Sequence, residues 1–285
     1  MAGRPHPLLA LLLLMAGPVG ASGAAPPQAP LWEFGLGVGA LGFADYRGAD
    51  TDSLYPVPVP YFVYRGEFLK ADRNGIRGLF LNNEQVELNL SLNATTPVRS
   101  SSRGTRAGMP SLRPTVEIGP SVEMHLWASA DQRRRLDLRL PVRAAFTVEA
   151  SPRRVGGLFT PHLNLDITDP AGLAGWNLGL LAGPLFADRR YDDYFYTVTP
   201  AYATASRPAY RARGGYAGSQ FIVSASRRFE SRWVGAFLRY DTLAGASFAD
   251  SPLVRRQGYW TAGIGIAWMI AQSSRLVDLG PEDPR

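Results

Sequence analysis

Cysteine is absent from this 285-residue sequence, which excludes disulfide bonds and thiolate chemistry. Lysine is nearly absent, since Lys70 is the only one and the other cations are arginines. Beyond the amino-terminal region, no segment approaches the roughly 18 consecutive apolar residues of a membrane-spanning helix. The net charge of +6 is modest, and the arginines are scattered along the chain between acidic residues. The sequence therefore has no basic stripe that would bind nucleic acid. An anionic lipid or lipopolysaccharide surface fits this charge better.

The amino terminus has the three parts of a secretory signal. Arg4 supplies a positive charge, residues 8–16 form an apolar run, and small residues follow at 20–25. The apolar run is too short to span a bilayer and has no stop-transfer flank. We therefore expect residues 1–24 to be a cleaved signal peptide and residues 25–30 to be a proline-rich leader.

What the rest of the sequence offers is strict alternation of apolar and polar residues. In residues 86–93 apolar side chains alternate with Glu, Asn and Ser, and the pattern recurs at 116–126, 136–143 and 159–167. A period of two predicts strands with one face against an apolar environment. No segment has the pattern of an amphipathic helix. We therefore expect an all-β protein.

The polar faces of these strands carry full charges, and aromatic residues gather near the strand ends. A soluble barrel would turn its apolar face inward, whereas charged polar faces and aromatic girdles favour a membrane barrel with lipid outside. The fold class predicted is a transmembrane antiparallel up-and-down β-barrel. Its lumen-facing residues are predicted to be Glu117, Glu123, His125, Asp137, Arg139, Arg143, His162, Asp166, Arg239 and Asp241.

Loop lengths predict about 12 strands between residues 31 and 270, one of them unbroken over 157–167, with both ends in the periplasm and a polar periplasmic tail at 271–285. Bacterial outer-membrane barrels have short periplasmic turns, long outer loops and an even number of strands. The third and fourth strands, at 67–72 and 75–81, are shorter than the roughly 9–11 residues of a full crossing. Ten full strands plus a short hairpin are therefore the alternative. The long outer loops are expected at 45–54, 95–113, 188–215 and 244–257.

The last strand, at residues 258–270, is expected to pair with the first, at 31–44, and so to close the wall. Small residues, including Gly263 and Gly265, occupy its lumen face and would allow backbone or a loop to approach. A polar tail follows Ile270, where such barrels usually end on an aromatic residue. We expect the assembly signal to be displaced inward, onto the lipid face formed by Trp260, Ile264, Ile266, Trp268 and Ile270.

The second strand contains Pro56, Pro58 and Pro60, which alternate with apolar residues. Residues two apart direct their backbone groups to the same neighbour, so three N–H donors are missing from one edge only. The other edge can pair normally. We predict either a weak seam in the wall at this edge or a strand shielded at the barrel rim.

Catalytic and metal-binding patterns are weak. Ser121 lies two pleats from His125 and Asp166 two pleats from His162, a spacing of about 13 Å that is too long for a hydrogen bond within one strand. Lumen polarity explains these residues without catalysis. No metal-ligand spacing or phosphate loop occurs. For Asp188, Asp192 and Asp193 in the long outer loop, a divalent-cation site is the alternative to the solvated acidic loop that we expect.

Several local patterns occur in the order found in one known family, and on them the chain resembles the MipA/OmpV outer-membrane proteins from residue 31 to residue 270. The name refers to MltA-interacting protein. The patterns are the strand at 55–61, Gly75-Ile76-Arg77-Gly78, Gly183-Pro184, the aromatic run at 191–196, Tyr210 with Gly214-Gly215, and Asp250-Ser251-Pro252. The resemblance implies a barrel in the outer membrane of a Gram-negative bacterium, with no catalytic residues and no cofactor.

The function that this resemblance implies is a scaffold. One family member links a lytic transglycosylase to a bifunctional penicillin-binding protein in murein (peptidoglycan) synthesis, so murein enzymes are the expected partners beside outer-membrane lipid and lipopolysaccharide. Other members have been treated as porin-like or immunogenic surface proteins. The alternatives to a scaffold are therefore a small-solute channel and, in third place, a lipid hydrolase.

Overall fold

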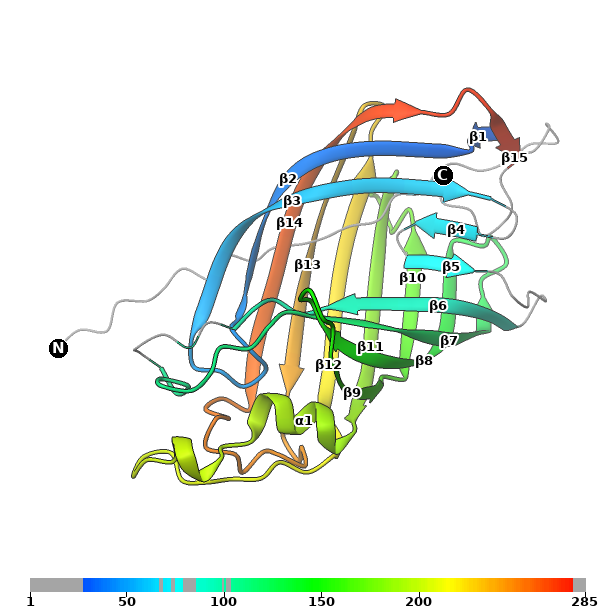
Figure 1. Ribbon diagram of the computed structural model, residues 1–285. Helices are drawn as coiled ribbons and strands as arrows, with labels where there is room; N and C mark the ends of the chain where they lie inside the picture. The colour runs from blue at the N-terminus through cyan, green and yellow to red at the C-terminus, as the bar shows by residue number, and fades with distance from the viewer. Residues whose placement is uncertain are drawn as a thin grey trace.

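The computed structural model describes residues 28–66, 69–72, 75–78, 86–98, 100 and 104–278, so the expected signal peptide lies outside the described residues. One antiparallel sheet of 13 strands dominates this part of the chain and curls into a barrel (Figure 1). No helix in the described ranges is long and apolar enough to cross a membrane.

The wall follows the chain order around the barrel. It is built from β2 (Trp32–Ala44), β3 (Asp52–Arg65), β4 (Leu69–Asp72), β5 (Gly75–Gly78), β6 (Val86–Ala94), β7 (Thr115–Ala128), β8 (Arg134–Thr147), β9 (Arg154–Phe159), β10 (His162–Thr168), β11 (Trp176–Ala187), β12 (Gly215–Arg228), β13 (Arg232–Thr242) and β14 (Gly258–Gln272). The last strand, β14, pairs with β2, which confirms the predicted closing pair.

One predicted strand, at residues 157–167, is broken into two. Its halves β9 and β10 lie end to end in the same place between β8 and β11. The break falls at Thr160 and Pro161, where proline lacks the N–H that a ladder needs. With β9 and β10 sharing one position, the described wall has ten long positions and the short hairpin β4–β5.

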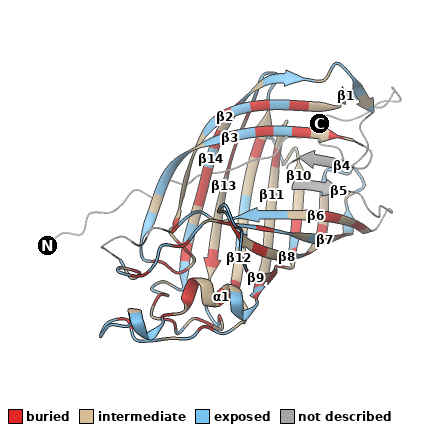
Figure 2. Ribbon diagram, in the orientation of Figure 1, coloured by how far each residue is buried: buried red, intermediate tan, exposed pale blue. Residues whose placement is uncertain are grey.

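The apolar face of the wall points outward (Figure 2). On β2, Phe34, Leu36 and Val38 are exposed while the alternate Gly35 and Gly37 are buried. On β14 the exposed residues are Trp260, Ile264, Trp268 and Ile270, with Ile266 half-buried. This is the arrangement of a barrel surrounded by lipid. The closely approached glycines of β14 accommodate side chains, because the ring of Phe237 covers Gly263 and Val59 covers Gly265.

The proline-containing strand β3 has one paired edge and one largely free edge. It pairs with β2 along Asp52–Tyr64 but with β4 only at Tyr64 and Arg65. Arg65 N donates to Leu31 O on the β2 side. Backbone nitrogens at odd positions of β3, such as that of Arg65, therefore point toward β2. The three prolines are at even positions, so their nitrogens point to the free edge, as predicted. Within the described ranges, that edge has no ladder partner over residues 52–63.

The two ends of the barrel differ. At one end, short turns join the strands, and β1 (Gln28–Pro30) pairs with β15 (Leu276–Asp278). These two strands fall in the segments expected to be a leader and a tail. The long connections gather at the opposite end, where α1 (Arg189–Tyr196) and the short η1 (Pro200–Tyr202) lie (Figure 1). We call this end the outer end because long loops face outward in bacterial barrels.

The helix α1 contradicts the expectation that no segment is helical. Asp188 caps it by accepting a hydrogen bond from Tyr191 N, and Arg189 lies 3.5 Å from Asp193 one turn later. The helix has only eight residues. Because hydrophobic periodicity needs a window of about 11–18 residues, so short a helix escapes detection by pattern.

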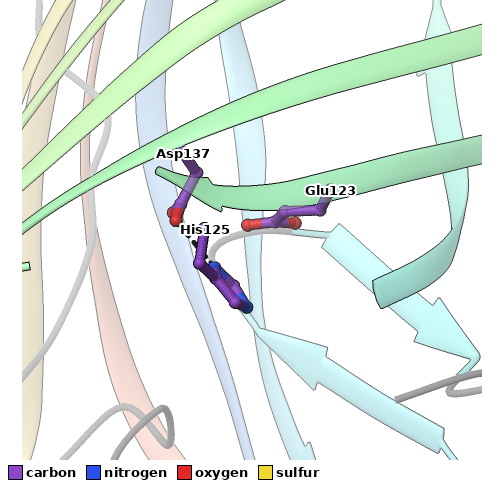
Figure 3. Close-up of side chains that lie close together, drawn as sticks. All are labelled: Glu123, His125 and Asp137. Carbon is purple, nitrogen blue, oxygen red and sulfur yellow. Dashed lines mark hydrogen bonds and ion pairs between the residues drawn. The ribbon is translucent and has the colours of Figure 1, made fainter. Parts of the chain in front are cut away.

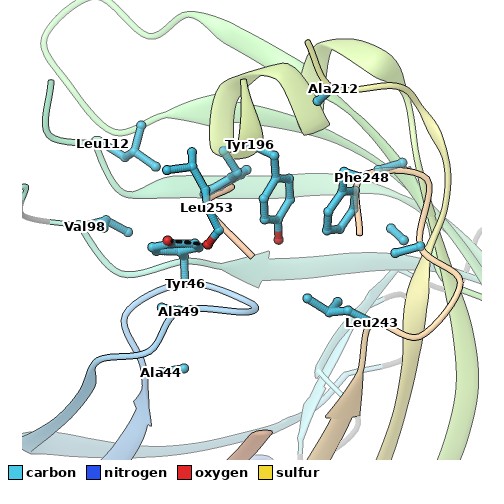
Figure 4. Close-up of a cluster of buried hydrophobic side chains, with 14 of the residues drawn as sticks. Ala44, Tyr46, Ala49, Val98, Leu112, Tyr196, Ala212, Leu243, Phe248 and Leu253 are labelled. Carbon is cyan, nitrogen blue, oxygen red and sulfur yellow. Dashed lines mark hydrogen bonds between the residues drawn. The ribbon is translucent and has the colours of Figure 1, made fainter. Parts of the chain in front are cut away.

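The loops of the outer end pack into a hydrophobic cluster that caps the barrel (Figure 4). Tyr46 comes from the β2–β3 connection, Leu112 from the β6–β7 connection and Tyr196 from α1, while Phe248 and Leu253 come from the β13–β14 connection. Tyr46 also donates its hydroxyl to Leu253 O at 2.7 Å. The loops predicted to be polar connections thus form the largest buried apolar cluster of the described residues.

Candidate functional site

A cavity of about 700 Å³ lies inside the barrel under the outer cap. Eight of the ten residues expected to face the lumen line it: Glu117, Glu123, Arg139, Arg143, His162, Asp166, Arg239 and Asp241. The other two, His125 and Asp137, lie in the barrel wall outside this cavity lining. We call this cavity the chamber.

The polar side of the chamber is a network of paired charges. Glu123 and Arg139 stand opposite each other in the β7–β8 ladder, with Arg139 Nη2 2.8 Å from Glu123 Oε1. Arg143 Nη1 lies 3.7 Å from Glu117 Oε2, and Arg143 Nε donates to Ser91 Oγ at 2.8 Å. Pairing offsets the cost of removing these buried charges from water. The network therefore holds the chamber polar while leaving these charges compensated.

Arg47 ties the outer cap to the wall. Its Nε donates to the Tyr259 hydroxyl at 3.0 Å, Nη1 to Ala217 O at 2.7 Å and Nη2 to Asp241 Oδ1 at 3.2 Å. The Tyr196 hydroxyl donates to Arg47 O at 3.0 Å. One residue thus joins the first long loop, three strands and α1. The sequence analysis did not single it out, because its partners lie about 150 to 210 positions away in the chain.

A group of three potential metal ligands lies at one side of the interior (Figure 3). The ligand atoms of Glu123, His125 and Asp137 lie within 4.8 Å of one another. His125 Nδ1 is 2.8 Å from Asp137 Oδ1, and Arg135 Nε donates to Asp137 Oδ2 at 3.1 Å. Because Glu123 also pairs with Arg139, the arrangement is that of an ion-pair network.

Asp192 is the most unusual charged residue of the outer cap. It is fully buried and lines the chamber, so the expectation of a solvated acidic loop is wrong for Asp192, although Asp188 is exposed and Asp193 half-buried. Burial raises the pKa of its carboxyl to about 8. Neither oxygen has a hydrogen-bond partner among the described residues, and the nearby Ser247 donates its hydroxyl to Arg213 O. A carboxyl in such surroundings favours its neutral form.

The half of the interior nearer the short turns holds an apolar cluster beside ion pairs. Val59, Tyr61 and Trp233 form the buried cluster, in which the Tyr61 and Trp233 ring centroids are 5.6 Å apart. Arg65 and Glu33 follow it toward the short turns, with Arg65 Nη2 2.8 Å from Glu33 Oε1. Packed apolar side chains and paired charges therefore lie between the chamber and the short turns.

Neither histidine forms part of a hydrolytic triad in the hydrogen bonds that the described residues make. His162 Nδ1 lies 2.8 Å from Thr160 O, and His125 Nδ1 faces Asp137. A serine nucleophile needs a hydrogen bond to its base. Ser121 instead lies opposite Asn89 and Pro141 in the ladders.

Sequence comparisons point to one family. The profile described as MltA-interacting protein MipA matches residues 36–270. The chain is 24% identical to the outer membrane protein OmpV of Vibrio cholerae serotype O1 over 237 residues, which is 81% of this chain and 84% of OmpV. It is also 24% identical over 237 residues to Omp26La, an outer membrane protein of Vibrio anguillarum, with the same shares covered.

Among solved structures, the chain resembles one described as a bacterial polysaccharide outer membrane secretin. The TM-score is 0.38 with 8% sequence identity, and the match covers 85% of this chain and 99% of that one. The homologues place this chain in the outer membrane of a Gram-negative cell.

Proposed function

The chain belongs to the MltA-interacting protein MipA family of outer-membrane proteins, and from this we infer a scaffold role. We propose a non-enzymatic outer-membrane barrel that holds a murein-degrading and a murein-synthesising enzyme at its periplasmic face. The family description, which names an interaction with MltA, supports a protein partner. Lipid and lipopolysaccharide would contact the outward apolar face.

The observation that carries this proposal is the packing of both barrel ends. A channel needs a continuous polar path, whereas one apolar cluster occupies the outer cap and a smaller one, with the Arg65–Glu33 ion pair beside it, lies toward the short turns. A barrel packed in this way is better suited to binding other proteins at its surface than to conducting solutes along its axis.

The turn between β7 and β8 supplies a docking element at the short-turn end. Asp131 fixes the turn, since its Oδ1 accepts hydrogen bonds from the Ser129 hydroxyl and, at 3.1 Å, from Arg133 N. Both hydrogen bonds lower the pKa of Asp131, the one from Ser129 more, so it stays charged. Arg133 and Arg134 are exposed on this turn, with their backbone N–H groups hydrogen-bonded to Asp131 and Ser129. Two guanidinium groups side by side fit an acidic patch on a partner.

The test is a pull-down of a purified lytic transglycosylase and a bifunctional penicillin-binding protein with the full-length protein in detergent. We expect both to be retained and the retention to fall by about tenfold, roughly 1.4 kcal/mol, in Arg133→Ala/Arg134→Ala. The matched control is Arg211→Ala/Arg213→Ala, which removes two exposed arginines from the outer end. No retention by folded wild type, or equal loss in the control pair, would refute the proposal.

A small-solute channel is the second candidate, because the barrel encloses a charged chamber of about 700 Å³. Planar-bilayer recordings separate the two functions. A scaffold with packed ends gives no discrete conductance steps, and regular steps from wild-type protein would favour the channel.

A further inference from the structure

The lining of the chamber shows where the barrel wall stops enclosing it. A paired strand presents alternate residues to the interior, as β8 does with Arg139, Pro141 and Arg143. The strand β6 instead lines the chamber with every residue from Asn89 to Ala94, and the lining continues through Thr96. Both faces of a strand reach one cavity only along the strand's edge. The chamber therefore extends to the edge of β6 that points away from β7.

The opposite rim of this opening is the proline edge of β3. Among the described residues, the hairpin β4–β5 is what stands between β3 and β6; it pairs with β3 at Tyr64 and Arg65, and β5 lies beside β6 (Figure 1). In the part of the chain that the structure describes, no strand pairs with β3 over residues 52–63. Proline nitrogens face this edge, so an added strand would find acceptors without matching donors. The sequence itself keeps this gap from being filled by another strand.

An apolar surface leads from this rim into the chamber. Tyr55 on β3 is 47% exposed, and its ring stacks on Phe43 with centroids 5.5 Å apart. The ladders place Tyr55, Leu41, Gly263 and Phe237 in one row across β3, β2, β14 and β13. The ring of Phe237 occupies the space over Gly263, so the row is continuous. Leu41, Phe43 and Phe237 all line the chamber.

Polar groups line the other side of the same opening. Ser91 accepts a hydrogen bond from Arg143 at 2.8 Å, and Asn93 donates to Glu117 at 2.9 Å. Tyr191 donates its hydroxyl to the same carboxylate at 3.0 Å. Glu117 and Arg143 already pair with each other, so a charged head placed beside Ser91 and Asn93 would be desolvated without a counter-ion. An uncharged head with hydroxyl groups can bond here without that penalty.

We propose that the chamber binds a single-chain amphiphile with an uncharged, hydroxyl-bearing head, which enters from the membrane between β3 and β6. The apolar chain lies along Tyr55, Leu41 and Phe237, and the head lies beside Ser91 and Asn93. The volume of about 700 Å³ falls within the range of about 300–1,000 Å³ that small-ligand pockets occupy. The exposed Leu54 and Leu92 beside the opening match a lipid-facing entrance.

The test uses the full-length protein in phosphatidylcholine vesicles and a monoacylglycerol with a photoreactive diazirine in its chain. After irradiation, we expect labelled peptides that contain Leu41 or Phe237. The variant Ser91→Trp, which places an indole at the inner rim, should reduce this labelling by about tenfold. The variant Leu88→Trp, on the outward face of the same strand and outside the chamber lining, should leave it unchanged. Heat-shifted mobility on SDS gels confirms that each variant is folded.

Two results would overturn the proposal. Labelling confined to outward residues such as Ile264 and Trp268 would mean that the probe contacts only the outer surface. Equal labelling of the chamber in folded Ser91→Trp and Leu88→Trp would mean that entry does not occur past β6. The requirement for an uncharged head is tested with a photoreactive fatty acid of the same chain length. This probe should label the peptides that contain Leu41 or Phe237 less than the monoacylglycerol does. Equal or stronger labelling by the carboxylate would refute the uncharged head.

Discussion

The ring of Tyr196 on α1 lies nearly parallel to the ring of Phe248 in the β13–β14 loop, with centroids 3.7 Å apart and planes 10° apart. The two residues are 52 positions apart (248 minus 196) and both are buried in the outer cap. Because Tyr196 also donates to Arg47 O, this stack connects the helix, one loop and the first long connection. The stack is thus one of the contacts that hold the separate segments of the cap together.

Removal of the stacked ring should loosen the cap. Phe248→Ala leaves a cavity in a fully buried site, and we expect a loss of about 3–5 kcal/mol in the free energy of unfolding. Limited proteolysis provides a local readout, since Arg106 is buried under the cap and donates to Phe195 O. Trypsin should cleave after Arg106 faster in the variant. Phe221→Ala, which removes an exposed ring, is the control; equal effects of both changes would show that the stack does not secure the cap.

The buried carboxyl of Asp192 should make the cap less stable as the pH rises. Its pKa is raised to about 8 by burial, from 3.8 in the unfolded chain, so between about pH 4 and pH 8 the folded protein holds a proton that the unfolded chain has lost. The unfolded state then binds fewer protons, and stability falls through this window. Melting temperatures at pH 5 and pH 8 test this. Asp192→Asn should reduce the difference, whereas the exposed Asp250→Asn should retain it; an unchanged slope in Asp192→Asn would contradict the assignment.

Gly156 should be irreplaceable where it meets the start of α1. Its φ is +148°, and a Cβ there would lie 2.4 Å from Tyr191 N and 2.5 Å from Asp188 Oδ1, the two atoms of the helix cap. Gly156→Ala should therefore cost more than the roughly 1–3 kcal/mol of backbone strain alone. Gly172→Ala is a matched control, since φ is +78° and no atom lies within 4 Å of the added Cβ. If urea unfolding gives both variants the same loss of unfolding free energy, then the contact of Gly156 with the helix cap does not matter for stability.

The lipid face near the end of β14 is proposed to carry the assembly signal. Trp268 and Ile270 are exposed there, just before the chain turns toward β15. The double change Trp268→Ala/Ile270→Ala should lower the amount of folded, heat-modifiable barrel in the outer membrane severalfold. Trp260→Ala, which removes the exposed tryptophan at the other end of the same strand, should have a smaller effect. A greater loss in Trp260→Ala would place the signal elsewhere.

Much of the wall could be predicted from the sequence, because the alternation of apolar and polar residues that marks a strand is a local pattern. Alternation in each segment predicted the strands, and the charges on the polar face predicted that the apolar face points outward, as Phe34, Leu36 and Val38 show. The three prolines of β3 also predicted that one edge of this strand would lack backbone donors and the other would pair normally. The prediction of an unbroken strand at 157–167 was wrong, because Pro161 lacks the N–H that a continuous ladder needs.

The cap and the chamber network were decided only by tertiary structure. The bonds of Arg47 to Ala217, Asp241 and Tyr259 join residues about 170 to 212 positions apart, and no local pattern marks such pairs. The burial of Asp192 likewise depends on loops that fold over it from distant parts of the chain. By itself, the sequence determined a lipid-facing wall, because side chains on a strand alternate with period two. Which loops close the outer end, and which charges meet inside, was decided by contacts that exist only once the barrel has formed.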